Sequence, residues 1–200
     1  LGIVSFPAAF ETAGLAALAG AENCDLLLMD EIGRMERRAD TYSARILTLL
    51  DGGVPEDCSL LLFNQPSTDL SADEVELVED YLEQGGQVMI LLNRTDLSNF
   101  NQILSDYGLT MAQGYIGDAA NYYLQYGSFY FSGTLSSSNE ITSDFDSDDL
   151  SLLYGAHGMT ESTPIRDTIE VDAFLTTTEQ GYSDATGETG TYILGAVATE

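Results

Sequence analysis

The sequence predicts an α/β fold, in which helices cover the faces of a parallel sheet. Residues 60–63 and 88–92 are short apolar runs, which is typical of strands buried on both faces. Between them, apolar side chains recur at helical spacing over residues 75–82, which indicates an amphipathic helix. A strand, a crossover helix and a second strand form a βαβ unit, and such a unit places its two strands parallel in one sheet.

The helix of this unit has its own start and stop signals. Ser71 offers an N-cap and Glu74 follows with the spacing of a capping box. Gly85 and Gly86 come directly after the last apolar turn, and glycine ends helices where the backbone must turn left-handed. We therefore expect the helix to begin after Ser71 and to end before Gly85.

The residues that precede this unit repeat the same alternation of strands and helices. Residues 25–29 form another apolar run, so a third strand is expected there. Helices are predicted over residues 8–19 and 36–50, the second of which ends at a pair of glycines. The resulting prediction is a three-layer, Rossmann-like (flavodoxin-like) parallel sheet, with strands near residues 25–29, 59–63 and 87–92 parallel and adjacent.

The predicted domain organisation is a single α/β domain over residues 1–200, since this length suits one domain. Residues 1–52 form a head that supplies strand–helix units, and residues 53–199 form the larger part. The strand-like runs after residue 108 are short and separated by polar loops. We expect them to form an irregular, β-rich extension at one edge of the sheet.

The charge of the chain is strongly acidic. Thirty-three Asp and Glu residues stand against six basic residues, and the formal net charge is −27. All six basic residues are arginines, so the chain has no lysine. Such a charge argues against nucleic acid and anionic membrane surfaces as partners. It is also typical of a high-salt habitat or an acidic proteome, so it does not by itself indicate a cation site.

The predicted strand at residues 25–29 leads directly into two carboxylates, Asp30 and Glu31. A strand that ends on Asp-Glu can hold Mg²⁺ and position a water molecule. With the following residues it reads DEIGRME, and residues 1–50 resemble a fragment of a P-loop nucleoside-triphosphatase family with a D-E-I-G-x-M-E signature. The resemblance implies that Asp30 binds Mg²⁺ and that Glu31 is the catalytic carboxylate. The phosphate-binding loop of such enzymes contains a lysine, which this chain lacks, so we expect a structural or vestigial role for both residues.

A second resemblance covers about residues 52–199. The sequences VPED (54–57), PSTDLSADE (66–74) and YLEQGG (81–86) are similar to motifs of the GldG-like domain of uncharacterised ABC-type transport systems. The resemblance implies an extracytoplasmic domain, membrane-tethered in its full-length protein, that works with an ABC permease and ATPase. It implies recognition of a protein or polymer rather than catalysis, with no cofactor. Mg²⁺ belongs only to the alternative, the nucleoside-triphosphatase fragment.

The predicted ligand site follows from the fold, since ligands of parallel α/β sheets bind at the carboxyl ends of the strands. Tyrosines crowd residues 115–131, and at this density they favour a β-rich edge or an interface over a ligand cage. No metal site is predicted, because the aspartates at 144, 146 and 148 have the spacing of a calcium loop without its glycine and glutamate. Whether Cys24 and Cys58 form a disulfide stays open. The ligand-binding candidates are Asn64, Gln65, Asn93 and Arg94, and the weak metal alternative is Asp144, Asp146 and Asp148.

Overall fold

The computed structural model describes residues 28–30, 54, 58–145 and 151–200. The chain divides into two compact units, Leu1–Leu92 and Asn93–Glu200, here called unit 1 and unit 2. This division lies after the predicted βαβ unit. The junction predicted at residues 50–53 between the head and the larger part lies outside the described residues.

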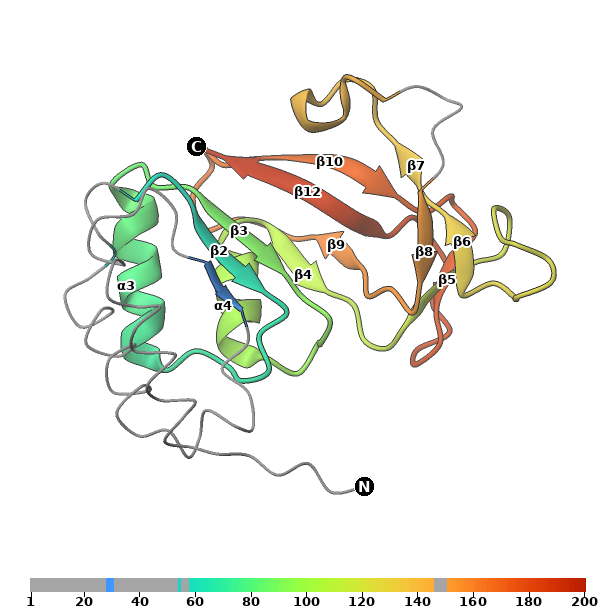
Figure 1. Cartoon of the computed structure of the whole chain (residues 1–200), viewed down its shortest axis with the longest axis horizontal. Helices are drawn as coiled ribbons and strands as arrows, with labels where there is room; N and C mark the ends of the chain where they lie inside the picture. Colours follow the sequence, from blue (N-terminus) through green and yellow to red (C-terminus); the bar gives the residue numbers. More distant parts are fainter. Residues whose placement is uncertain (1–27, 31–53, 55–57, 146–150) are drawn as a thin grey trace, which may run out of the picture. The chain divides into compact units, whose positions relative to one another are not determined.

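Unit 1 contains a parallel sheet of three short strands (Figure 1). The strands are β1 (Leu28–Asp30), β2 (Leu61–Asn64) and β3 (Val88–Leu91), hydrogen-bonded in the order β1-β2-β3. Both pairings are parallel, with Leu62 of β2 opposite Leu28 of β1 and Met89 of β3. The prediction of three adjacent parallel strands is confirmed, with β2 beginning two residues and β3 one residue later than expected.

The crossover between β2 and β3 is the helix α3 (Ala72–Glu83), which begins at the predicted capping box. The Ser71 hydroxyl accepts a hydrogen bond from the Glu74 amide at 3.3 Å, and the Glu74 carboxylate accepts one from the Ser71 amide at 2.7 Å. Val75 and Val78 are buried on the apolar face of the helix. The helix and its cap are therefore confirmed.

The two glycines after α3 serve different purposes. Gly85 has a φ of +87° and meets no other atom at its Cβ position, so it is needed for backbone conformation. Gly86 is needed for space, because a Cβ atom there would lie 2.4 Å from the ring of Tyr81. The hydroxyl of Tyr81 donates a hydrogen bond to the Cys58 carbonyl at 2.9 Å, which holds the ring in place. Cys58 itself is a free cysteine.

The described residues of unit 1 thus belong to the α/β class. They supply one helix and a short parallel sheet. A three-layer sheet needs helices on both faces, and the helices predicted over residues 8–19 and 36–50 lie outside the described residues. The Rossmann-like arrangement therefore stays a prediction.

Unit 2 is built mainly from antiparallel sheets, so the predicted β-rich character is confirmed, whereas its described strands form sheets of their own and do not add to the edge of the parallel sheet. Its strands pair with one another in three antiparallel sheets. The sheets join strands that lie far apart in the sequence, such as residues 109–111 with residues 159–161, and antiparallel sheets suit strands that have one buried and one exposed face. The largest sheet has the order β4-β9-β12-β10-β7, with strands Leu109–Met111, Met159–Glu161, Ile193–Thr199, Glu170–Thr176 and Thr134–Leu135.

Two smaller sheets complete unit 2. Strand β5 (Ile116–Asp118) pairs with β11 (Gly181–Ser183), and β6 (Tyr130–Ser132) pairs with β8 (Leu152–Tyr154). A 3-10 helix follows β7 at Glu140–Thr142. The overall class of the described chain is therefore mixed α/β with mostly antiparallel strands.

The core of unit 2 is formed by side chains from α4 (Ser98–Asp106) and from the small sheets. Phe100 of α4, Ile116 of β5 and Phe131 of β6 are each 0% exposed. Gly108 follows the C-cap of α4 and has a φ of +83°, the left-handed conformation in which glycine ends helices. No helix among the described residues is long and apolar enough to cross a membrane.

Candidate functional site

The carboxyl end of the parallel sheet in unit 1 is the first candidate site. Strand β2 ends at Asn64, which lies opposite Asp30 of β1 and Leu91 of β3. Gln65 follows with a φ of +49°, and among the described residues no other non-glycine residue has a positive φ. Its amide donates to the Leu91 carbonyl at 2.8 Å. A left-handed non-glycine residue costs about 1–3 kcal/mol and is concentrated at functional positions, so this strand end is the strained point of unit 1.

One residue of the nucleoside-triphosphatase alternative, Asp30, lies at the neighbouring strand end. Asp30 is the last residue of β1, in register with Asn64. Glu31 lies outside the described residues. The backbone therefore brings Asp30 and Asn64 to neighbouring strand ends, as a site at the carboxyl end of the sheet requires.

The other two ligand candidates, Asn93 and Arg94, belong to unit 2. Arg94 forms a two-pronged ion pair with Asp96, with Nη2–Oδ2 at 2.6 Å and Nε–Oδ1 at 2.8 Å. The hydrogen bonds from Arg94 lower the pKa of Asp96, and those to Asp96 raise the pKa of Arg94. An anionic ligand at Arg94 would therefore compete with the carboxylate of Asp96.

The calcium alternative rests on three aspartates, of which one is described. Asp144 lies exposed after the 3-10 helix, whereas Asp146 and Asp148 lie outside the described residues. Within the described part of the chain, no group of three His, Cys, Asp or Glu side chains is arranged to hold a metal ion.

Three tyrosines of unit 2 form a cluster on β6, β8 and the loop before β6. The rings of Tyr130 and Tyr154 stack with centroids 4.1 Å apart, and the ring of Tyr126 lies 5.3 Å from that of Tyr130. Tyr154 is 68% exposed and Tyr126 61% exposed. The hydrogen bond with Tyr154 raises the pKa of Tyr130 above its usual range. We call this the tyrosine surface, and its members are Leu124, Tyr126, Tyr130, Leu152 and Tyr154.

The opposite face of the same two strands is buried. Phe131 of β6 is fully buried, and a Cβ atom on Gly133 would lie 2.6 Å from the Leu175 side chain and 3.1 Å from that of Leu153. Side chains alternate between the faces of a strand. Packing of this inner face therefore leaves Tyr130, Leu152 and Tyr154 directed outward.

The loop that carries the tyrosine surface is held by a buried carboxylate, Asp118, which is 0% exposed. One carboxylate oxygen accepts hydrogen bonds from the amides of Ala120 at 2.8 Å and Asn121 at 3.0 Å and from the Thr178 hydroxyl at 3.0 Å. The other accepts the Thr178 amide at 2.7 Å. Burial acts to raise the pKa of Asp118, but these hydrogen bonds outweigh burial and lower the pKa.

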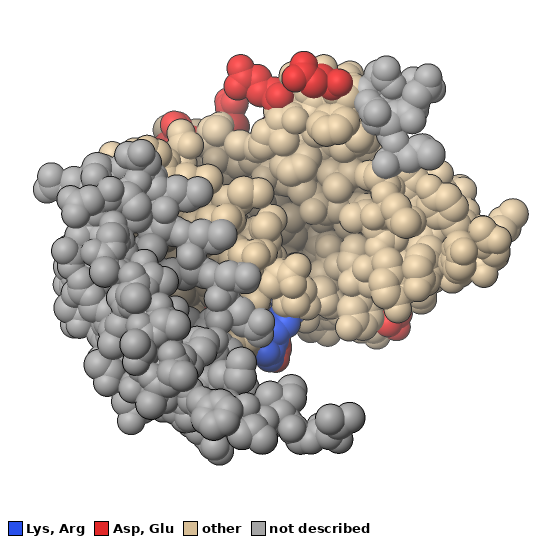
Figure 2. Space-filling model, viewed as in Figure 1, with Lys and Arg blue, Asp and Glu red and all other residues tan. Residues whose placement is uncertain are grey.

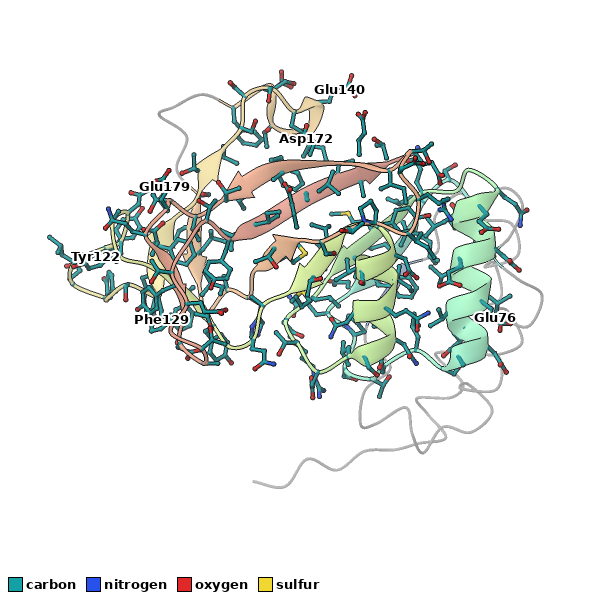
Figure 3. All side chains as sticks on the ribbon, turned by 180° about the vertical axis from the view of Figure 1, so that it is seen from behind. Glu76, Tyr122, Phe129, Glu140, Asp172 and Glu179 are labelled. Atoms are coloured by element: carbon teal, nitrogen blue, oxygen red, sulfur yellow. The ribbon has the colours of Figure 1, made fainter. Side chains whose placement is uncertain are left out.

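Sequence reasoning missed Asp118. The bonds from the amides of Ala120 and Asn121 are local and form an Asx-turn, which aspartate often makes with the amides two and three residues after it, so the sequence could have indicated them. The contact with Thr178 joins residues 60 positions apart, and nothing local in the sequence indicates it. Figure 3 shows Tyr122, Phe129 and Glu179, from the two loops that Asp118 joins, grouped at one end of unit 2.

The tyrosine surface also differs from the rest of the chain in charge. Residues 119–139 and 150–160 contain no Asp, Glu, Lys or Arg, although the whole chain is 20% charged. Figure 2 shows the surface over β6 and β8 almost entirely in tan. These two uncharged segments contain β6, β8 and the loops before β6 and after β8, whereas the segment between β7 and β8 contains acidic residues.

Comparison with known proteins gives two matches and one negative result. A family model described as NTPase matches residues 3–67, so this part of the chain is similar to a fragment of an NTPase. The solved structure of the mmIFT52 N-terminal domain is similar to 76% of this chain, at 17% sequence identity and a TM-score of 0.50. The chain spans 66% of the length of that structure, and at this identity the likeness concerns the fold alone. No curated protein matches the chain.

Proposed function

We propose that this chain is a non-catalytic, extracytoplasmic domain of an ABC-type transport system, membrane-tethered in its full-length protein. It recognises a partner rather than converting a substrate. The observation that carries the proposal is the tyrosine surface, an exposed and uncharged cluster of stacked rings on a strongly acidic protein.

The composition of this surface is that of an interface core. Such cores are enriched in tyrosine and depleted of charged residues, because a buried charge must be desolvated and an aromatic ring need not be. An exposed apolar patch is also costly to leave in water unless a partner covers it. The Asp118 hydrogen bonds fix the loop that precedes the rings, so little ordering is left to occur on binding.

The link to ABC-type transport comes from the GldG-like motifs. In the structure their residues shape the scaffold of unit 1: Ser71 and Glu74 cap α3, and Gly86 lies against Tyr81. None of these contacts is chemistry of a reaction. They support the shared architecture that the motifs imply.

A photo-crosslinking experiment tests the proposal in cells that produce the full-length protein. A benzoylphenylalanine placed at position 154 is expected to crosslink a permease or ATPase subunit of the transporter, identified by mass spectrometry. The matched control is position 165, since Ile165 is 64% exposed but lies outside the tyrosine surface. The proposal fails if position 154 captures no transporter subunit, or if both positions capture the same one equally.

A second candidate function, a Mg²⁺-dependent nucleoside-triphosphatase fragment, is favoured by the NTPase match over residues 3–67 and by the position of Asp30 at a strand end. Titration calorimetry with ATP and Mg²⁺ separates the two candidates. A recognition domain is expected to give no heat of binding at micromolar concentrations. Micromolar binding that is lost in Asp30→Ala and kept in Asp144→Ala would establish the second candidate instead.

A further inference from the structure

Strand β8 has one edge that no other strand covers within the described residues. Its sheet contains two strands, β6 and β8, paired antiparallel with Phe131 opposite Leu153. The far side of β6 is occupied, because Tyr122 and Phe131 form a bridge there. The open edge of this sheet is therefore the outer side of β8.

The hydrogen bonds of β6 determine which backbone groups of β8 face outward. The Tyr130 carbonyl accepts from the Tyr123 amide at 2.8 Å, and the Ser132 amide donates to the Asn121 carbonyl at 2.9 Å. Tyr130 and Ser132 thus direct their backbone groups away from β8. Because these directions alternate along an antiparallel strand, Phe131 exchanges hydrogen bonds with Leu153.

The same alternation applies along β8. Since Leu153 faces β6, the N–H and C=O groups of Leu152 and Tyr154 point to the open edge. Gly133 and Ser151 agree with this assignment, because the Ser151 hydroxyl bonds both the amide and the carbonyl of Gly133. The open edge thus presents two donors and two acceptors, spaced as an added strand requires.

The side chains at this edge favour such a strand. Leu152 is 64% exposed and Tyr154 is 68% exposed, and both belong to the tyrosine surface. Natural proteins protect edge strands with charges, prolines, bulges or a very short length. Here residues 150–160 contain no charged residue and no proline, so among these devices β8 relies on its short length of three residues.

Charge decides between the possible occupants. Two copies of this chain would each bring a formal charge of −27, and this repulsion opposes self-pairing. Acidic groups lie near this edge: the Asp184 carboxylate accepts the amide of Tyr115, whose ring lies 3.9 Å from the Cβ position of Gly155 after β8, and the exposed Glu140 and Asp144 precede β8 in the chain. These groups favour a strand with basic flanks, and they disfavour an acidic one.

We propose that β8 is a docking edge, where an extended segment of a partner protein adds as a further antiparallel or parallel strand. The segment has apolar or aromatic side chains that pack on Tyr130, Leu152 and Tyr154, and Lys or Arg at its ends. This inference rests on the proposed recognition function, since it assigns the mode of binding at the same surface.

The test uses the whole chain and a displayed library of linear peptides. Enriched peptides are expected to alternate apolar and other residues and to be flanked by Lys or Arg. One of them is synthesised, and its Kd is measured by fluorescence anisotropy. Leu152→Pro removes the outward N–H and is expected to weaken binding at least tenfold, because one backbone hydrogen bond is lost and the ring blocks the edge. Leu152→Val keeps that N–H and is expected to change Kd less than threefold.

A second measurement does not depend on how the proline variant folds. Two further versions of the peptide carry N-methyl groups, one on the odd-numbered and one on the even-numbered residues. The version whose methyl groups replace the N–H groups that face β8 is expected to bind wild-type protein at least tenfold more weakly, and the other version is expected to bind almost normally. The proposal is overturned by enrichment of no peptide, by equal binding to Leu152→Pro and wild type, or by indifference to N-methylation. Self-association through β8 at low salt, or a neutral oligosaccharide that binds Leu152→Pro unchanged, also overturns it.

The two proposals fail in different ways. If position 154 crosslinks a transporter subunit and the peptide tests fail, recognition stands and strand addition is wrong. If peptides add to β8 but position 154 captures no transporter subunit, the docking edge stands and the link to transport is wrong.

Discussion

Asp118→Asn is expected to destabilise unit 2 by about 3 kcal/mol, the cost of disrupting hydrogen bonds to a buried charged group. The carboxylate accepts four hydrogen bonds, two of them donated by the amide and the hydroxyl of Thr178. An asparagine keeps the shape but turns an NH₂ group toward one of these donors, so one donor stays buried without an acceptor. Urea unfolding followed by tyrosine fluorescence measures the loss, since most of the tyrosines lie in unit 2.

The matched control is Asp184→Asn. Asp184 also accepts a backbone amide, that of Tyr115, but it lies exposed. Its replacement is expected to cost less than about 1 kcal/mol, because water can satisfy the same groups. Equal losses at the two positions would show that burial of Asp118 does not matter.

The destabilisation caused by Asp118→Asn is also expected to depend on pH. The pKa of Asp118 is lowered in the folded state, so the unfolded chain binds this proton at a higher pH than the folded chain does. The contribution of Asp118 to stability is therefore complete above its unfolded pKa of about 3.9 and is lost as the pH falls through the folded pKa. The stability difference between wild type and Asp118→Asn should shrink below about pH 4, whereas a difference that grows on acidification would contradict the shift.

Gly86→Ala is expected to destabilise unit 1 by about 2 kcal/mol, in the range of overpacking. A Cβ atom at this position would lie 2.4 Å from the Tyr81 ring. The ring cannot turn away without breaking its hydrogen bond to the Cys58 carbonyl. Urea unfolding followed by far-UV circular dichroism measures the loss.

A double-mutant cycle identifies the cause. In a Tyr81→Ala background, Gly86→Ala is expected to cost less than about 0.5 kcal/mol, since the clash is gone. Gly85→Ala is the control: its φ is +87° with no atom nearby, so its cost of about 1 kcal/mol should be the same in both backgrounds. If Gly86→Ala lowers the free energy of unfolding equally with and without the Tyr81 ring, the clash with this ring is not the cause.

Features that depend on neighbours in the sequence were predictable. The capping box at Ser71 and Glu74, the left-handed Gly85, and the order of β1, β2 and β3 all follow from local pattern and from the rule for βαβ units. The position of Asn64 and Gln65 at a strand end follows in the same way. Strain at Gln65 does not, because its φ depends on the bond to Leu91 in the neighbouring strand.

Features that depend on distant neighbours were not predictable. The antiparallel sheet β4-β9-β12-β10-β7 joins strands from across unit 2, and the sequence shows only short apolar runs there. The tyrosine-rich segment was visible, but which rings face outward depends on β6 pairing with β8. The sequence does not distinguish Asp118 from the other acidic residues, of which the chain has 33 in all, because its role depends on the contact with Thr178.

The sequence by itself determined the class of unit 1, the ends of its helix, and the net charge of −27, because these are set by residue type and by spacing of a few positions. Tertiary structure decided the rest. It gave Gly86 its role, buried Asp118, and left the outer edge of β8 open beside stacked tyrosines. Each of these depends on which side chain or strand occupies the adjacent space, and contacts between distant parts of the chain alone decide that.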